Sequence, residues 1–301
     1  MYTRQAILFI THLPLLIGLS ACSPNITNIP TQTVLPPSPT ATITLTPSPI
    51  PTATLTPTPT PLACLSEPGT VKQDVVVTSN PAQEFLIYLP PCYEYSADTR
   101  YPVLYLLHGQ TYTDDQWIRL GVPKIADRLI YSKEALPFIV VFPDDRLWNL
   151  KAGASFGLRF ILDVIPYVDT HYRTIADREH RSLGGLSRGG GWAIELGFAN
   201  PELFGALGLH SPGVFNENAP YIERTIQNIP QDLRPQLWLD VGDADSELAS
   251  IDAFEEILTR NDYVHTFHLY QGDHTENYWG KHVEEYLRWY VQGWQEVPAE
   301  Q

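Results

Sequence analysis

Positive charge is scarce in this sequence. The 301 residues include 19 Lys and Arg against 34 Asp and Glu, so the formal net charge is −15 at pH 7. Nucleic-acid binding depends on clustered Lys and Arg that neutralise phosphates, and the sequence has no basic patch. We therefore expect no nucleic-acid partner, and the acidic surface is compatible with solubility outside the cell.

A hydrophobic run long enough to cross a membrane comfortably is also missing. The apolar stretch at residues 6–19 follows a short, positively charged segment at residues 1–4. It is shorter than the roughly 20 residues that a membrane-spanning helix needs. It ends in Leu-Ser-Ala-Cys at residues 19–22, which resembles the lipobox of bacterial lipoproteins. We expect residues 1–22 to be a lipoprotein signal peptide with Cys22 lipidated. The alternatives are an ordinary cleaved signal peptide and an uncleaved anchor.

This interpretation predicts where the protein resides. It would be exported and anchored by lipid to the outer face of the bacterial cytoplasmic membrane or to the cell surface. The lipid would be its only contact with the membrane.

Charged residues are absent from residues 23–62, where Pro and Thr dominate. Such a segment cannot bury enough apolar surface to offset the entropy lost on ordering. Its proline content favours an extended spacer of about 3.1 Å per residue where polyproline II persists. We expect residues 23–63 to be a disordered linker and residues 64–301 to be one α/β domain.

Cysteine is rare, with three residues in the whole chain. If Cys22 carries lipid, Cys64 and Cys92 remain as a pair in an oxidising setting. A disulfide between them would join the end of the linker to the region after an early strand. Two buried free thiols are the alternative, and we favour the disulfide.

Short apolar strand patterns alternate with helical patterns from residue 71 onward. The near-continuous apolar runs at 103–107 and 138–142 are typical of strands buried on both faces of a parallel sheet. Residues 75–78 and 84–89 predict an antiparallel hairpin at one sheet edge. The alternation predicts a mostly parallel sheet with helices on both faces. Further strands are predicted at 181–186, 206–209, 237–241 and 265–270, and helices at 122–131, 156–171, 190–199, 247–261 and 276–294.

The strongest functional signal is Gly-Leu-Ser-Arg-Gly at residues 185–189, between a predicted strand and a predicted helix. A serine on such a sharp turn has a strained backbone, and the flanking glycines avoid clashes as the chain doubles back. The helix that follows favours developing negative charge at its N-terminus. We therefore predict that Ser187 is a nucleophile. A glycine-rich turn without chemistry is the alternative.

A serine nucleophile needs a base and a carboxylate that orients the base. Among nine histidines, His274 is distinctive because it follows the last predicted strand and so reaches the same sheet edge as Ser187. Asp240 lies inside a predicted strand and is the weakest candidate for the carboxylate. Asp243 and Asp245 both lie on the loop that follows, and position alone does not separate them. The chain order Ser, Asp, His is the order of an α/β-hydrolase.

An oxyanion hole needs two backbone N–H donors. One should come from Arg188, the residue after the nucleophile. The other should come from the turn that follows the strand at 103–107, where Gly109 permits a tight bend and Gln110 supplies the amide. An ordinary turn at the end of a strand is the alternative for this second segment.

Three segments of the chain carry a family resemblance. They read Tyr-Pro-Val-Leu-Tyr-Leu-Leu-His-Gly at 101–109, Ile-Pro-Tyr-Val-Asp-Thr-His-Tyr-Arg at 165–173 and Gly-Leu-Ser-Arg-Gly-Gly at 185–190. Together they resemble the esterase family related to esterase D, which includes feruloyl esterases, enterochelin esterases and the antigen 85 mycolyltransferases. The resemblance covers roughly residues 71–294 and implies an α/β-hydrolase fold, usually without a large lid domain.

The resemblance also implies roles for particular residues. The family has approximately Gly-x-x-Asp after this strand, and residues 242–245 put Asp245 in that place, which favours Asp245 over Asp243. The family's histidine precedes an aromatic residue and the last helix, as His274 precedes Trp279. The residue after His-Gly supplies an oxyanion amide, which again indicates Gln110.

One position departs from the family pattern. Arg188 follows the serine where many members have Met or Gln, so its side chain is expected to reshape the pocket. Trp148, in the loop 144–156, and Trp279 are our candidates for substrate contact. No specificity motif identifies the acyl or alcohol group.

These features predict a serine carboxylic ester hydrolase that acts on an ester substrate, with feruloyl or acetyl esters of polysaccharide suggested by the family alone. No metal or nucleotide motif occurs, so we expect no metal and no cofactor. An acyltransferase like the mycolyltransferases is the enzymatic alternative, and a non-catalytic sugar-binding lipoprotein is the alternative from another class. The oligomeric state is not predicted.

Overall fold

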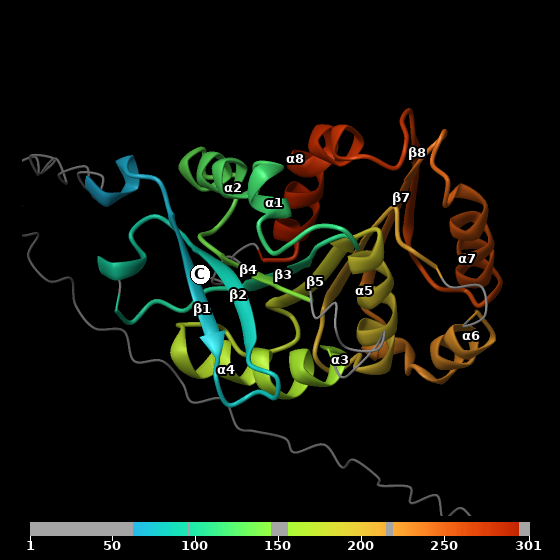
Figure 1. The fold of residues 1–301 in the computed structure, drawn as a ribbon, viewed down its shortest axis with the longest axis horizontal. Helices are drawn as coiled ribbons and strands as arrows, with labels where there is room; N and C mark the ends of the chain where they lie inside the picture. Colours follow the sequence, from blue (N-terminus) through green and yellow to red (C-terminus); the bar gives the residue numbers. More distant parts are fainter. Residues whose placement is uncertain (1–62, 96, 146–155, 215–218, 295–301) are drawn as a thin grey trace, which may run out of the picture. The chain divides into compact units, whose positions relative to one another are not determined.

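Eight strands form one sheet in the order β1-β2-β4-β3-β5-β6-β7-β8 (Figure 1). The computed structural model describes residues 63–95, 97–145, 156–214 and 219–294. The strands from β4 to β8 in this order pair in parallel, whereas β1 and β2 are antiparallel at one edge. The predicted sheet and edge hairpin are therefore confirmed. The strands are β1 (Thr70–Val76), β2 (Gln83–Leu89), β3 (Val103–Leu107), β4 (Ile139–Pro143), β5 (Arg181–Leu186), β6 (Ala206–His210), β7 (Gln236–Gly242) and β8 (Thr266–Tyr270).

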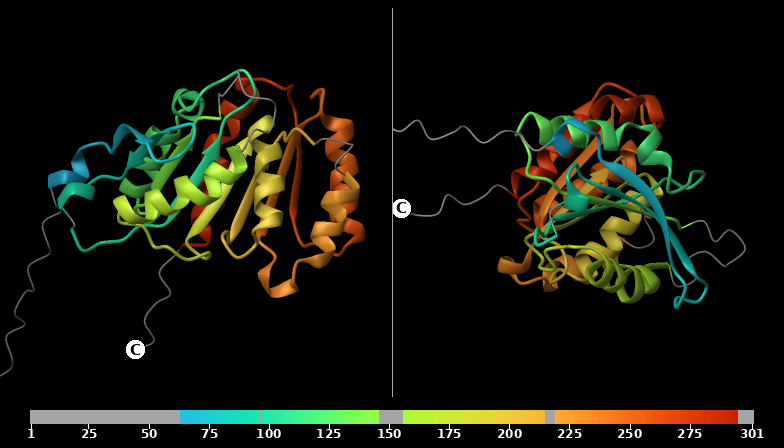
Figure 2. Two further views of the ribbon diagram at one scale, coloured as in Figure 1. Left: turned by 60° about the horizontal axis from the view of Figure 1, so that its bottom comes forward. Right: turned by 90° about the vertical axis from the view of Figure 1, so that its left-hand side faces the viewer.

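Helices cover both faces of the sheet (Figure 2). One face packs against α1 (Gln116–Arg119), α2 (Val122–Tyr131) and α8 (Glu276–Gln292). The other face packs against α3 (Phe156–Arg159), η3 (Phe160–Val164), α4 (Ile165–His171), α5 (Arg188–Ala199), α6 (Ala219–Asn228) and α7 (Leu248–Arg260).

No helix in the described ranges has both the length and the apolar character needed to span a bilayer.

The apolar run of β3 shows why the central strands lack alternation. All five of its residues are buried. Val103, Tyr105 and Leu107 enter the core on one face, while Leu104 and Leu106 enter the core on the other. Because successive side chains of a strand point to opposite faces, a strand covered twice must be apolar throughout.

Two predicted elements differ from the structure. The first strand begins at Thr70, earlier than predicted, because pairing with β2 orders an edge whose outer residues are exposed and polar. The predicted helix at 156–171 contains a π-helical stretch, η3, just before Pro166. Proline lacks the amide that would continue the α-helical ladder, which explains a change of hydrogen-bond register there.

Two α-helices were not predicted at all, the four-residue α1 and the longer α6. Helix α6 buries Ile222 and Ile226, four residues apart on one face. Its other residues are largely polar, so the apolar stripe is narrow in the sequence. Only packing against α5 and α7 reveals the helix as part of the core.

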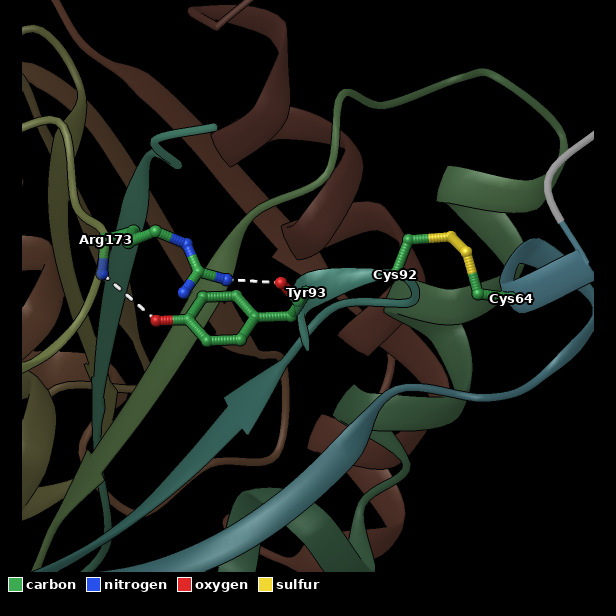
Figure 3. Close-up of a disulfide and its surroundings, with 4 residues drawn as sticks. All are labelled: Cys64, Cys92, Tyr93 and Arg173. Carbon is green, nitrogen blue, oxygen red and sulfur yellow. Dashed lines mark hydrogen bonds between the residues drawn. A yellow bond between two sulfur atoms is a disulfide. The ribbon is translucent and has the colours of Figure 1, made fainter. Parts of the chain in front are cut away.

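A disulfide joins the start of the described chain to the turn that follows β2 (Figure 3). It links Cys64, in the short helix η1 (Ala63–Ser66), to Cys92, just after β2. The neighbouring Tyr93 is held by Arg173, whose amide donates to the phenol oxygen at 3.0 Å and whose guanidinium lies 3.8 Å from the ring centroid. The covalent link therefore attaches η1 to a well-packed part of the domain.

We predict that replacing Cys64 and Cys92 together by Ala lowers the free energy of unfolding by about 3 kcal/mol, because the closed loop spans 28 residues. Urea unfolding followed by tryptophan fluorescence measures the change. Adding a reductant should lower the midpoint of the wild type and leave that of the double variant unchanged. Equal midpoints for the two oxidised proteins would contradict the prediction.

Candidate active site

Ser187 lies at the turn between β5 and α5 in a strained backbone conformation. Its φ of 53° and ψ of −120° are unusual for a residue with a side chain. Two neighbouring segments hold this conformation. The Ser187 amide donates to the carbonyl of His210 at 3.0 Å, and the Gly213 amide donates to the Ser187 carbonyl at 2.8 Å.

The flanking glycines are required by close backbone approach. A Cβ on Gly185 would lie 2.3 Å from the carbonyl carbon of Gly189, and a Cβ on Gly189 would lie 2.2 Å from the carbonyl oxygen of Leu107. Neither position can accept a side chain unless the backbone shifts. The Gly-x-Ser-x-Gly spacing in the sequence is therefore a direct consequence of this turn.

His274 contacts both Ser187 and Asp245. Its Nε2 lies 2.8 Å from Ser187 Oγ, and its Nδ1 lies 2.9 Å from each carboxylate oxygen of Asp245. A carboxylate only accepts, so Nδ1 carries the proton and the Ser187 hydroxyl donates to Nε2. This arrangement allows Nε2 to take the hydroxyl proton.

The environment of Asp245 keeps it ionised. Burial acts to raise the pKa of the carboxyl, but hydrogen bonds oppose this effect and leave the pKa below its usual value. The donors are His274 Nδ1, 2.9 Å from each carboxylate oxygen, and the Glu247 amide at 2.8 Å. An ionised Asp245 can both orient His274 and stabilise its protonated form.

The tertiary structure distinguishes Asp243 from Asp245, which their positions in the sequence did not. Asp243 is exposed, and its carboxylate accepts the Gly272 amide at 3.0 Å. It thereby helps to hold the turn before His274. Asp245, not Asp243, contacts the imidazole.

Asp240 has another position, fully buried inside β7. Its carboxylate accepts four hydrogen bonds, from His210 at 2.7 Å and from Trp238, Tyr278 and Tyr286 at 2.8 Å each. This network links β6, β7 and α8 beneath the site. Asp240 therefore has no contact with His274 and holds the scaffold instead.

The two expected oxyanion donors lie on adjoining segments. The first turn of α5 packs so closely on the end of β3 that Gly189 approaches Leu107. Gln116 holds the β3 turn by accepting the Gly109 amide at 2.8 Å. Within the described residues, neither the Gln110 amide nor the Arg188 amide donates to another group. Both are available to an oxyanion.

The Arg188 side chain points to the loop after β4. Its Nε lies 2.8 Å from Asp145, which also accepts the indole N–H of Trp192 at 2.9 Å. The Asp145 amide donates to His108 Nε2 at 3.0 Å. Arg188 is thus tied to the turn that precedes Gln110, which explains how the site accommodates a charged residue in this position.

Trp148 and Trp279 were expected to contact substrate, and the structure describes only Trp279. Trp148 lies outside the described residues. Trp279 is 2% exposed, and its ring packs edge-on against His274 with centroids 4.9 Å apart. Buried in this way, Trp279 supports the imidazole and offers no open surface to a substrate.

Cys22, the candidate for lipidation, also lies outside the described residues.

Two residues of the site were not singled out from the sequence. Asp145 lies shortly after the end of β4, and Ser211 directly follows β6, so both are at the carboxyl edge of the sheet. The rule that pointed to His274, a polar residue just after a strand, could have found both. Their contacts depend on the fold and could not have been assigned.

Comparisons with known proteins agree with this geometry. The family described as "Putative esterase" matches residues 79–149 and 159–290. An endo-1,4-beta-xylanase/feruloyl esterase from Xylanibacter ruminicola is 36% identical over 124 residues, which cover 38% of this chain and 17% of that protein. An esterase from Mycobacterium tuberculosis is 32% identical over 133 residues, which cover 42% of this chain and 28% of that protein. The chain thus spans less than a third of either relative.

Solved structures share the fold. A ferulic acid esterase superimposes with a TM-score of 0.67 at 25% identity, covering 75% of this chain and 98% of its own. The feruloyl esterase module from Clostridium thermocellum gives a TM-score of 0.66 at 19% identity, covering 81% and 96%. The expected α/β-hydrolase fold and the family resemblance are confirmed.

We predict that Asp245→Asn lowers kcat by roughly 10⁴-fold, because the amide would stabilise the wrong imidazole tautomer. Asp243→Asn, the matched control two residues away, should stay within a few fold of the wild type because it does not touch His274. Steady-state hydrolysis of p-nitrophenyl acetate measures both. The assignment fails if the two variants lose activity equally while both remain folded.

Proposed function

The chain belongs to this esterase family, and we propose that it is a serine carboxylic ester hydrolase with Ser187 as the nucleophile. The observation that carries the proposal is the hydrogen-bonded series from Ser187 through His274 to Asp245. It joins a nucleophile, a base and an orienting carboxylate in the order that acyl transfer requires.

The first half of the reaction forms an acyl-enzyme. Ser187 Oγ attacks the ester carbonyl carbon while His274 Nε2 takes the hydroxyl proton. The carbonyl oxygen becomes an oxyanion, which the amides of Gln110 and Arg188 stabilise. As the tetrahedral intermediate collapses, the alcohol leaves with the proton from His274, and the acyl group remains on Ser187.

Water completes the cycle. His274 takes a proton from water, whose oxygen attacks the acyl carbon, and the second intermediate collapses to release the carboxylic acid. The proton returns to Ser187 Oγ. Asp245 stays ionised throughout, in keeping with its lowered pKa.

The proposed substrates are feruloyl or acetyl esters carried by polysaccharide. Support comes from the names of similar proteins, an endo-1,4-beta-xylanase/feruloyl esterase and a ferulic acid esterase. Transfer of the acyl group to a sugar alcohol would use the same acyl-enzyme, and no contact among the described residues of the site favours it over hydrolysis.

We predict that the wild type hydrolyses at least one of p-nitrophenyl acetate, methyl ferulate and acetylated xylan, and that Ser187→Ala lowers this activity by several orders of magnitude. The serine oxygen is the atom that bonds to the acyl carbon, so the variant can retain only the contribution of binding and the oxyanion hole. Released p-nitrophenol, ferulate or acetate is measured. Turnover by Ser187→Ala at a rate near that of the wild type would refute the proposal, and an ester product formed with an added sugar would indicate acyl transfer.

We also propose that Cys22 is lipidated and anchors the exported protein to the outer face of the cytoplasmic membrane or to the cell surface. The support is the Leu-Ser-Ala-Cys sequence at residues 19–22, after an apolar run. The uncharged segment 23–62 would then space the enzyme from the membrane.

Expressed in full length in a bacterium, the wild type should sediment with membranes and enter the detergent phase. Cys22→Ser should lose both properties because it cannot accept the lipid. Cys64→Ser is the matched control and should remain with membranes. If Cys22→Ser still sediments with membranes and enters the detergent phase, lipid on this residue is not the anchor.

A further inference from the structure

Ser211 follows β6 directly, in a turn that is attached to the nucleophile on both sides. The residue before it, His210, accepts the Ser187 amide at 3.0 Å. Gly213, two residues after it, donates to the Ser187 carbonyl at 2.8 Å. Ser211 is therefore fixed next to the strained turn, and its own amide is satisfied by the Asp240 carbonyl at 2.8 Å.

The backbone of Ser211 is itself unusual. Its φ is 44°, in the left-handed region that favours glycine, and the residue is fully buried. A residue with a side chain is costly in this conformation. Glycine would relieve that cost, so a serine here indicates a use for the hydroxyl.

The Ser211 hydroxyl has one evident target. Its Oγ is buried and has no hydrogen-bond partner within the described residues. It is nevertheless close enough to Asp245 to be among the groups that lower the pKa of that carboxylate. Leaving a buried hydroxyl without a partner is unfavourable, which favours a donor role towards this acceptor.

Asp245 has room for such a donor. Its Oδ1 accepts from the Glu247 amide and from His274, whereas Oδ2 is contacted by His274 alone among the hydrogen bonds of the described residues. A carboxylate oxygen can accept two hydrogen bonds. A third donor would stop the carboxylate from rotating about its Cβ–Cγ bond.

We propose that Ser211 is a positioning residue that donates from Oγ to Asp245 and holds the carboxylate in place against His274 Nδ1. The inference rests on the proposed function of the triad. Ser211 touches neither substrate nor the reacting atoms, and acts only through Asp245.

The proposal predicts both a rate effect and a pH effect. Losing a hydrogen bond to a charged group should lower kcat roughly 10- to 100-fold with KM unchanged. A carboxylate with one donor fewer holds the imidazolium proton more strongly, so the acid limb of kcat/KM should move to higher pH. Among the described groups that set the pKa of Asp245, His274 is the only titratable side chain.

Three variants of the full chain test the idea with p-nitrophenyl acetate. Ser211→Ala removes only the oxygen, while Ser211→Gly also relieves the positive φ. Ser182→Ala is the matched control, since Ser182 is a buried serine at the opposite end of β5 from Ser187. We expect both Ser211 variants to show the fall in kcat and the shifted acid limb, and Ser182→Ala to show neither.

The outcomes are distinct. Wild-type kcat and an unmoved acid limb in Ser211→Gly would overturn the proposal, because the serine would then serve only local packing. Should Ser211→Ala fail to fold, the glycine variant still decides. Turnover by Ser187→Ala at a rate near that of the wild type would instead refute the proposed function, which separates the two failures.

Discussion

The strained turn at Ser187 is the constraint around which the site is arranged. A residue with φ of 53° and ψ of −120° is unfavourable in isolation and persists only where its surroundings hold it. Here the Ser187 amide and carbonyl are hydrogen-bonded to the turn after β6. The flanking glycines pack so closely against neighbouring backbone that the turn cannot change its conformation. The hydroxyl is consequently presented at the carboxyl edge of the sheet before any substrate arrives.

The remaining groups reach this hydroxyl because the strand ends are fixed relative to one another. Buried Asp240 links β6, β7 and α8 through four hydrogen bonds, and each of these elements borders a loop of the site. The loop after β7 carries Asp245, and His274 lies just before α8. A fully satisfied polar network of this kind restricts how the elements can slide, which an apolar core of the same volume would do less specifically.

The sequence allowed Ser187 and His274 to be chosen because local rules apply to them. A serine between close glycines at a strand-to-helix junction is typical of a nucleophile on a sharp turn, and a histidine after the last strand must lie at the same edge. Trp279 shows the limit of such rules. An aromatic residue near the site was expected to meet substrate, yet it is buried against the imidazole, because the start of α8 turns its ring inward.

The sequence by itself determined the class of fold, the order of the strands along the chain and the choice of Ser187 as the candidate nucleophile, since periodicity and backbone strain are local properties. Family resemblance was needed to favour Asp245 over Asp243. Only the tertiary structure showed why: the turn after β7 directs Asp245 inward to His274 and leaves Asp243 exposed. The same holds for Ser211 and Asp145, whose roles depend on contacts between segments distant in the chain. Side-chain direction at a sheet edge is set by packing of the whole domain, and no local pattern encodes it.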